Sequence, residues 1–388
     1  MSNINDLIKK ECPNGVLFKS LSDIASITIG EFVHKNKQNE NSEYPVYNGG
    51  ISNTGFYEEY NNDGKNVIIS ARGANAGYVN RVYGKYWAGN SCYSIKIKDE
   101  KEVNWIYLYH YLKNKQKDLL GEQQTGSIPA VSKKQVENLK IAIPTIHVQE
   151  EIVKFLDKSS ELEKELEAEL EVRQKQYEYC LTKINEMKEQ KVKLEEICDV
   201  SAGGTPSKAH SEYWENGTIK WLGSTVCENK KGVSEITNFI TELGLSKSSA
   251  KLLKPETTLI AMVGATIGKV AYVDFESCTN QNIASLYPKN TETLDPSYLY
   301  HACRSLYPIF LNYANGKFAM ASLGFIKGLE IPIPNINKQK RIANFLDKFD
   351  MLINDITYGI PAEIELRKKQ YEYYRDRLLS FEEVSVSE

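Results

Sequence analysis

The chain has 388 residues, of which 41% are hydrophobic and 26% charged, and its formal net charge is −3. This length exceeds one ordinary domain of roughly 150 residues and predicts two or three domains. The slight acidity excludes a protein that holds nucleic acid by strong positive charge alone. The charge is uneven, however, because residues 149–196 hold 9 basic and 14 acidic residues whereas residues 1–148 hold 18 and 15. The globular part is therefore neutral to mildly basic, which permits DNA binding without arguing for it.

Cysteine usage and hydropathy indicate the compartment. The seven cysteines are odd in number and no two lie within four positions, so neither a disulfide framework nor a CxxC zinc site is indicated. Met1–Lys10 has no apolar signal core, and the longest apolar run, Thr258–Val273, is too short to span a bilayer. We therefore expect a cytoplasmic protein with no membrane role and no metal site.

The first part of the chain reads as a globular unit of strands and turns. Leu21–Gly30 alternates like a strand, and Tyr44–Tyr60 places glycine and asparagine between aromatic and β-branched residues, as in short strands joined by loops. Val67–Ile69 predicts a buried strand, and Gly73–Gly77 predicts a tight turn directly after it.

These features recur in the second half of the chain. The turn Gly73–Gly77 returns 191 positions later as Gly264–Gly268, and Tyr107–His110 returns at the same offset as Tyr298–His301. Agreement is confined to turns and core positions, while the loops between them differ. The repeat is therefore an entire unit of globular domain plus helix, and the matching glycines predict scaffold turns.

Two long helices follow the two globular units. Apolar residues recur every three or four positions over about 148–187 and again over about 338–379. Each segment predicts a helix near 60 Å long at about 1.5 Å per residue, and neither can bury so narrow a seam alone, so we expect an antiparallel coiled coil. The offset between the copies grows from 190 at Phe155 to 194 at Tyr177, which predicts one extra helical turn in the second copy. Pro361 should kink that helix or start a new segment.

The predicted fold class is therefore α+β, with two similar mixed α/β domains separated by two long helices in an internal pseudo-twofold repeat. Dimeric DNA readers place two reading heads on half-sites about 34–36 Å apart. Because the loops of the two copies differ, we expect two different half-sites and an unread spacer whose length the helices fix. A two-headed structural adaptor without DNA specificity predicts the same loop divergence and stays open.

No catalytic constellation is visible in the sequence. Gly264–Val270 resembles a phosphate-binding loop, but its spacing is one residue short and Val270 stands where a hydroxyl would bind magnesium. His110 and His301 match across the repeat inside a helix, which favours a packing role. The chain is predicted to bind a partner rather than to transform one.

The doubled helical segments carry a resemblance to a known family. In each copy a proline and a glutamine precede an apolar run, and an Arg-x-x-x-Tyr-Glu-Tyr motif follows. These residues are Pro144, Gln149–Lys158 and Arg173–Tyr179 in the first copy, and Pro334, Gln339–Lys348 and Arg367–Tyr374 in the second. Together they resemble the DNA specificity subunit of type I restriction–modification systems, over nearly the whole chain.

This resemblance implies a domain plan and a set of partners. Two target-recognition domains, 1–147 and 191–336, would alternate with two helical regions, 148–190 and 337–388. The family subunit has no catalytic activity and no cofactor of its own. It recruits two modification subunits, which methylate adenine with S-adenosylmethionine, and the complex further recruits ATP-dependent restriction subunits. Cys180 departs from the pattern, since its counterpart is Tyr374.

Candidate contact residues follow from their chemistry and position. Amide and guanidinium side chains suit adenine and guanine edges, whereas hydroxyls, lysines and turn amides suit phosphates. Aromatic and arginine residues outside the seam suit partner docking. The DNA-binding candidates are Asn48, Ser52, Asn53, Arg72, Asn75, Thr125 and Ser127 in the first domain, and Thr205, Ser207, Lys208, Ser224, Thr266, Asn280, Gln281 and Lys317 in the second. The partner-binding candidates are Arg173, Tyr177, Tyr179, Arg367, Tyr371 and Tyr373.

Overall fold

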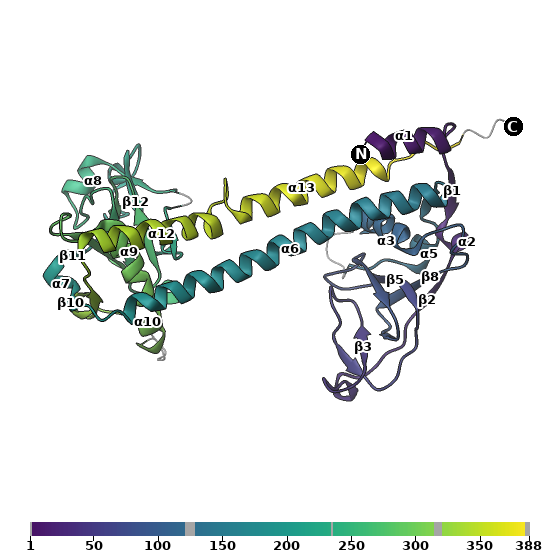
Figure 1. The fold of residues 1–388 in the computed structure, drawn as a ribbon, viewed down its shortest axis with the longest axis horizontal. Helices are drawn as coiled ribbons and strands as arrows, with labels where there is room; N and C mark the ends of the chain where they lie inside the picture. Colours follow the sequence, from purple (N-terminus) through teal and green to yellow (C-terminus); the bar gives the residue numbers. More distant parts are fainter. Residues whose placement is uncertain (1, 121–128, 234–235, 314–319, 385–388) are drawn as a thin grey trace. The chain divides into compact units, whose positions relative to one another are not determined.

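A computed structural model describes residues 2–120, 129–233, 236–313 and 320–384. The chain divides into two compact units (Figure 1). Unit 1 comprises Met1–Lys164 together with Leu366–Glu388, and unit 2 comprises Glu165–Glu365. Each unit therefore combines one globular domain with segments of both helical regions. In the part of the chain that the structure describes, no helix has the length and apolarity needed to cross a membrane.

Among the described residues, the globular part of unit 1 contains three small sheets. The largest has the antiparallel strand order β2-β8-β5-β6, the second has the order β4-β3-β7 with β3 and β7 parallel, and the third pairs β1 with β9. Helix α3 packs on β5 and β6. The elements are α1 (Ser2–Glu11), β1 (Leu17–Ser20), α2 (Leu21–Ile24), β2 (Ala25–Ile29), η1 (Lys35–Lys37), β3 (Tyr44–Tyr47), β4 (Gly55–Tyr57), β5 (Lys65–Ser70), β6 (Val79–Tyr83), β7 (Trp87–Ala88), β8 (Cys92–Ile97), α3 (Trp105–Asn114), α4 (Gln116–Leu120), α5 (Lys133–Glu137) and β9 (Lys140–Ile143).

The globular part of unit 2 repeats this topology. Its sheets have the orders β11-β18-β15-β16-β13, β14-β12-β17 and β10-β19, again with a parallel pair, β12 and β17, in the second sheet. The elements are β10 (Lys191–Lys193), α7 (Leu194–Ile197), β11 (Cys198–Ala202), η2 (Ser211–Tyr213), β12 (Ile219–Leu222), η3 (Ser224–Val226), β13 (Lys230–Lys231), β14 (Phe239–Ile240), α8 (Glu242–Ser246), β15 (Thr257–Ala261), η4 (Gly264–Thr266), β16 (Val270–Val273), β17 (Cys278–Thr279), β18 (Ile283–Pro288), α9 (Pro296–Ser305), α10 (Tyr307–Tyr313), α11 (Leu323–Gly328) and β19 (Glu330–Pro332). The short edge strand β13 is the main addition. The predicted repeat is confirmed.

The first helical region is one continuous helix, but the second is broken. Helix α6 spans Ile146–Asn185, which is 40 residues, whereas the second copy forms α12 (Ile336–Asn354) and α13 (Ile360–Leu378). The prediction of an extra helical turn is therefore wrong: the inserted length lies at the break. Asp355 Oδ1 accepts the backbone N–H groups of Thr357 (2.6 Å) and Tyr358 (2.9 Å), which turns the chain out of the helix. Pro361 then stands in the first turn of a new helix, where proline is tolerated.

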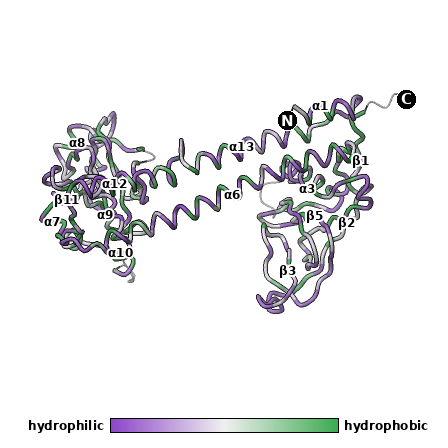
Figure 2. The backbone as a smooth tube through the Cα atoms, viewed as in Figure 1, coloured by the Kyte–Doolittle hydropathy of each residue, from purple (hydrophilic) through white to green (hydrophobic). Residues whose placement is uncertain are grey.

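Within each unit the two helical regions pair antiparallel. In unit 1 the rings of Phe155 and Tyr374 lie 5.5 Å apart, and Glu163 lies 3.6 Å from Lys368. The residue number rises along α6 from 155 to 163 while it falls along α13 from 374 to 368, so the two helices are antiparallel. In unit 2 the rings of Tyr177 and Phe349 stack at 6.3 Å. Figure 2 shows apolar and polar residues alternating along α6 and α13, as the predicted seams require.

The repeated glutamines lock the start of each helical region to its domain. In unit 1, Gln149 Nε2 donates to the carbonyls of Pro144 and Glu102, both at 2.9 Å, and its Oε1 accepts the N–H of Asn104 at 2.8 Å. Gln339 repeats the arrangement in unit 2, where its Oε1 accepts the N–H of Asp295 at 2.9 Å. Both glutamines are fully buried, so this motif residue serves the fold.

Candidate nucleic-acid interface

Four loops of unit 1 meet at the end of strand β5. The N–H of Ala71 donates to the carbonyl of Ser91 (2.8 Å), and the N–H of Val131 donates to the carbonyl of Ala71 (2.8 Å). The hairpin loop after β3 joins them, because a Cβ at Gly49 would lie 2.8 Å from the Arg72 carbonyl oxygen. These bonds bring together the loop after β3, the glycine turn, the β7–β8 loop and the segment before α5.

Unit 2 builds the same arrangement from different side chains. The N–H of Met262 donates to the carbonyl of Asn282 (2.9 Å), and the N–H of Ala321 donates to the carbonyl of Met262 (2.8 Å). Met262 and Asn282 stand 191 positions after Ala71 and Ser91. The backbone of this loop cluster is therefore a shared scaffold, whereas its side chains differ between the units.

An asparagine side chain holds the β7–β8 loop in unit 1 and the equivalent β17–β18 loop in unit 2, but the two asparagines follow different strands, β3 and β17. In unit 1, Asn48 Oδ1 accepts the N–H of Ser91 at 3.1 Å. In unit 2, Asn280 Oδ1 accepts the N–H of Asn282 at 3.0 Å. A Cβ at Gly89 would lie 2.6 Å from Asn48 Oδ1, so the glycine makes room for the asparagine. The acceptor oxygens of both predicted residues are thus committed to loop structure.

The glycine turns adopt the conformation that their matching positions indicated. Gly73 and Gly77 have φ of 94° and 79°, and Gly264 and Gly268 have φ of 69° and 74°, values that favour glycine over any other residue. Arg72, at the start of the first turn, is exposed, while Asn75 within that turn is half-buried. Thr266 occupies the second turn, where its hydroxyl points toward the Val263 carbonyl at 3.5 Å.

Several predicted residues of the second domain come together in this cluster. Thr205 Oγ1 donates to Gln281 Oε1 at 2.6 Å. The N–H of Asn280 donates to the Leu222 carbonyl at 3.0 Å, which places Ser224 beside the same loop. Thr205 and Gln281 are exposed, so this hydrogen-bonded pair lies on the surface of unit 2.

The other predicted residues lie in an exposed turn, farther along the loop after β3, or outside the described residues. Ser207 and Lys208 lie in an exposed turn, whose Ser207 carbonyl accepts Trp214 Nε1 at 3.3 Å. Ser52 and Asn53 continue the loop after β3, and the Ile51 carbonyl before them accepts Asn80 Nδ2 at 3.3 Å. Thr125, Ser127 and Lys317 lie outside the described residues.

One polar residue of the cluster, Asn90, was not identified from the sequence. Asn90 stands 191 positions before Gln281, and both are exposed at the tip of equivalent loops, β7–β8 and β17–β18. Both side chains are amides, which can donate to and accept from one base edge. The offset that aligned the glycine turns would have identified Asn90.

The predicted partner-docking tyrosines divide into two kinds. Tyr179 and Tyr373 are 62% and 58% exposed, as expected for outward residues. Tyr177 is completely buried, which contradicts the expectation that it faces outward, and Tyr371 is partly buried against His110. Tyr179 lines a groove of about 430 Å³ between α6 and α12 with five neighbours, namely Val172, Lys175, Gln176, Cys180 and Phe349.

The two predicted docking arginines lie on the helix surfaces. Arg173 donates from Nε to Glu169 at 2.7 Å and from Nη1 to Gln176 at 3.0 Å. Arg367 Nη1 donates to Gln370 at 3.1 Å. Each arginine contacts residues of its own helix, α6 for Arg173 and α13 for Arg367. These contacts orient the guanidinium groups without burying them.

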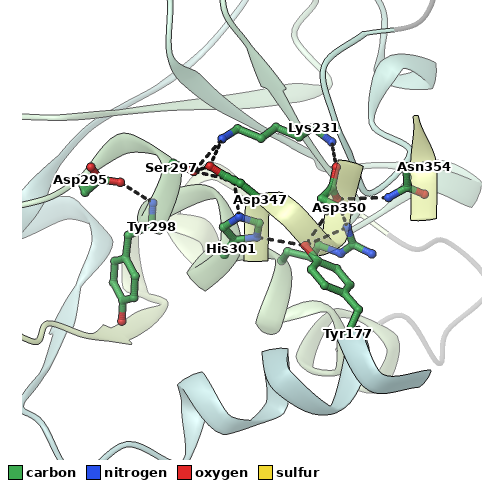
Figure 3. Close-up of polar contacts among 10 residues, drawn as sticks. Tyr177, Lys231, Asp295, Ser297, Tyr298, His301, Asp347, Asp350 and Asn354 are labelled. Carbon is green, nitrogen blue, oxygen red and sulfur yellow. Dashed lines mark hydrogen bonds and ion pairs between the residues drawn. The ribbon is translucent and has the colours of Figure 1, made fainter. Parts of the chain in front are cut away.

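The histidines that match across the repeat are buried and hydrogen bonded at both ring nitrogens. Figure 3 shows these bonds for His301. Burial disfavours the cation and lowers the pKa of His110 and of His301, although Asp157 and Asp347 oppose this shift. Burial alone would raise the pKa of Asp347, but hydrogen bonds from His301 and Lys231 outweigh it and lower that pKa to about 2. The packing role predicted for both histidines is therefore confirmed.

Among the residues that the structure describes, no group of three or more His, Cys, Asp or Glu side chains could hold a metal ion. Burial raises the pKa of the Cys92, Cys198 and Cys227 thiols to about 12, so these cysteines are inert packing residues.

Comparisons with known proteins agree with the two-unit architecture. The sequence model of the type I restriction modification DNA specificity domain matches residues 13–172 and 186–366. The Type I restriction enzyme EcoR124I/EcoR124II specificity subunit of Escherichia coli is 36% identical over 300 residues, covering 73% of this chain and 72% of its own. A putative type I specificity subunit of Mycoplasma pneumoniae is 30% identical over 371 residues, covering 93% and 96%. The crystal structure of a type I restriction–modification S subunit from M. genitalium shares the fold, with a TM-score of 0.60 at 18% identity over 94% of this chain and 96% of that one. The chain therefore belongs to the family of type I restriction–modification DNA specificity subunits.

Proposed function

We propose that the chain reads an asymmetric, two-part DNA site, one half with each loop cluster. Membership of the family gives the chain a role in DNA sequence specificity. The observation that carries the finer proposal is the preserved backbone ladder, Ser91–Ala71–Val131 in unit 1 and Asn282–Met262–Ala321 in unit 2, beneath differing side chains. A shared backbone with different exposed side chains suits two domains of one fold that each recognise a different DNA sequence.

The exposed amides and the turn arginine are the proposed base readers. Asn90 and Gln281 suit an adenine edge and Arg72 suits a guanine edge, because each can pair through two hydrogen bonds. Thr205 holds the Oε1 of Gln281 at 2.6 Å, which orients the amide. Ser52, Ser224 and Thr266 suit phosphate contacts, which position a protein without carrying sequence information.

The helical regions are proposed to set the spacer and to dock the modification subunits. Continuity of α6 over 40 residues supports a role as a ruler, since a helix transmits length at about 1.5 Å per residue. The exposed Tyr179 and the apolar groove beside it offer the kind of surface that a partner helix covers. Tyr373 is the equivalent exposed aromatic residue in unit 1. Two adenine methyltransferase subunits would bind S-adenosylmethionine, and restriction subunits would bind ATP, so the chain itself is proposed to be non-catalytic.

Methylation mapping tests this proposal against the structural adaptor. Cells that express the chain with a type I methyltransferase partner should acquire N6-methyladenine in one asymmetric motif made of two short sequences and an unread spacer. An adaptor without DNA specificity would leave the methylation pattern unchanged. A variant chain with Asn90→Ala and Gln281→Ala should assemble normally, but methylation should become less specific for the motif or disappear.

A further inference from the structure

A tyrosine, a histidine and an aspartate form a buried chain of hydrogen bonds in unit 2 (Figure 3). The Tyr177 hydroxyl lies 3.0 Å from His301 Nδ1, and His301 Nε2 lies 2.7 Å from Asp347 Oδ1. The carboxylate can only accept, so Nε2 carries the proton. Since burial keeps the ring neutral, Nδ1 accepts from the tyrosine hydroxyl.

Unit 1 contains the same chain in equivalent positions. The Tyr371 hydroxyl lies 3.2 Å from His110 Nδ1, and His110 Nε2 lies 3.0 Å from Asp157 Oδ1. The histidine is 1% exposed. Burial raises the pKa of Tyr371 to about 12, so its hydroxyl stays protonated as a donor.

The two tyrosines cross over between the repeats. Tyr177 belongs to the helical region that follows the first domain, yet its partner His301 lies in the second domain. Tyr371 follows the second domain, yet its partner His110 lies in the first. Each domain is thus held by its own aspartate, from the helix that follows it, and by a tyrosine from the helical region of the other repeat.

A cation ties each aspartate to an edge strand of the large sheet. In unit 1, Arg81 on β6 donates to Asp157 at 3.0 Å. In unit 2 the position equivalent to Arg81 is Tyr272, and Lys231 on the added strand β13 supplies the charge instead. Its Nζ lies 2.7 Å from Asp347 and 4.7 Å from the centre of the Tyr272 ring. The sheet, the domain helix and both helical regions therefore meet at one hydrogen-bonded point in each unit.

We propose that Tyr177 and Tyr371 are positioning residues, each of which sets the orientation of the recognition domain that belongs to the other repeat. This inference rests on the proposed two-part reading. Neither hydroxyl would touch DNA. Loss of one hydroxyl leaves a buried histidine acceptor unpaired and frees that domain to tilt on the helices, while the other domain keeps its complete chain.

The test uses Tyr177→Phe and Tyr371→Phe in the full chain, assembled with its methyltransferase partner. Hydroxyl-radical footprints would follow each half-site separately, and exchange of residues 21–142 for those of a relative would show which half-site the first domain reads. Tyr177→Phe should weaken protection of the second domain's half-site about tenfold and leave the first intact, and Tyr371→Phe should do the reverse. The exposed Tyr358→Phe serves as the control and should change neither, since Tyr358 is 86% exposed.

Four outcomes would overturn one idea or the other. Equal weakening of both half-sites, weakening of the wrong one, or no change in a folded complex would overturn the crossed positioning. A wild-type complex without a two-part footprint would instead overturn the proposed function on which it rests. Asp347→Asn and Asp157→Asn keep the side-chain size and must affect the same half-sites as Tyr177→Phe and Tyr371→Phe, which preserves the test where a tyrosine variant fails to fold.

Discussion

Removal of the Arg304 guanidinium should destabilise unit 2 selectively. Arg304 and Asp350 are 7% and 4% exposed, and their side chains are joined at 2.8 Å. The guanidinium also lies 4.3 Å over the Tyr177 ring. Breaking one partner of a buried pair typically costs about 3–5 kcal/mol. In Arg304→Met, Asp350 still accepts hydrogen bonds from the Lys231 N–H at 3.0 Å and the Asn354 amide at 3.2 Å. We therefore expect a loss of stability near the lower end of this range.

Urea unfolding followed by hydrogen exchange can measure this loss in each unit. A loss of about 3 kcal/mol lowers the midpoint by about 1–1.5 M at an m-value of about 2–3 kcal/mol/M. Peptides from α9 should show this shift, and peptides from α3 should not. Lys113, the equivalent residue in unit 1, donates to the Val79 carbonyl at 3.1 Å, and the position equivalent to Asp350 is Ser160. Lys113→Met should therefore cost less and act on unit 1 only.

A double variant separates loss of the charge pair from loss of packing. Arg304→Met with Asp350→Asn removes both charges and keeps an acceptor oxygen for the Lys231 N–H, so it should recover part of the stability lost in the single variant. The reasoning fails if Arg304→Met costs less than about 1 kcal/mol, or if α3 and α9 lose protection together.

Three further predictions concern the second glycine turn, stability at low pH and the length of the DNA spacer. Gly268→Ala should destabilise unit 2 by about 2–3 kcal/mol, because the new Cβ would lie 2.4 Å from the Phe310 Cβ. Gly264→Ala should cost about 1 kcal/mol, because its Cβ would have nothing within 4 Å. Equal shifts of the melting temperature in the two variants would contradict this. Asp347 has a folded pKa of about 2 against 3.8 unpaired, so it should contribute about 1–2 kcal/mol above pH 4 that is lost as the pH falls toward 2, and Asp347→Asn should lack that slope in acid unfolding. Insertion of a four-residue turn near Glu167 should lengthen the spacer in the mapped methylation motif while both half-sites persist; an unchanged spacer would show that α6 is not the ruler.

The repeat and its scaffold were predictable because local chemistry fixes them. A turn that needs positive φ retains glycine, so Gly73 and Gly264 were matched from the sequence and have that conformation. The buried histidines were recognised for the same reason, since a packed position tolerates little change. The docking role of Tyr177 was assigned from its residue type, and its complete burial contradicts the outward position expected of it.

Features that depend on tertiary contact were not predictable. Four inserted residues are compatible with one more helical turn, and only the capping bonds of Asp355 decide for a break. The exchange between Asn48 and Asn280 cannot be found by alignment, because the two asparagines follow different strands, β3 and β17, and accept equivalent backbone N–H groups. The crossing of Tyr177 to His301 likewise requires knowing which helix lies against which domain.

Exchange of one recognition domain tests the central claim most directly. Residues 21–142 would be replaced by the same segment of a relative, and N6-methyladenine would be mapped in cells that express the hybrid with the methyltransferase partner. We predict a two-part motif in which one half changes while the other half and the spacer stay as in the parent. A motif changed in both halves would contradict independent reading by two domains held on a common helical frame.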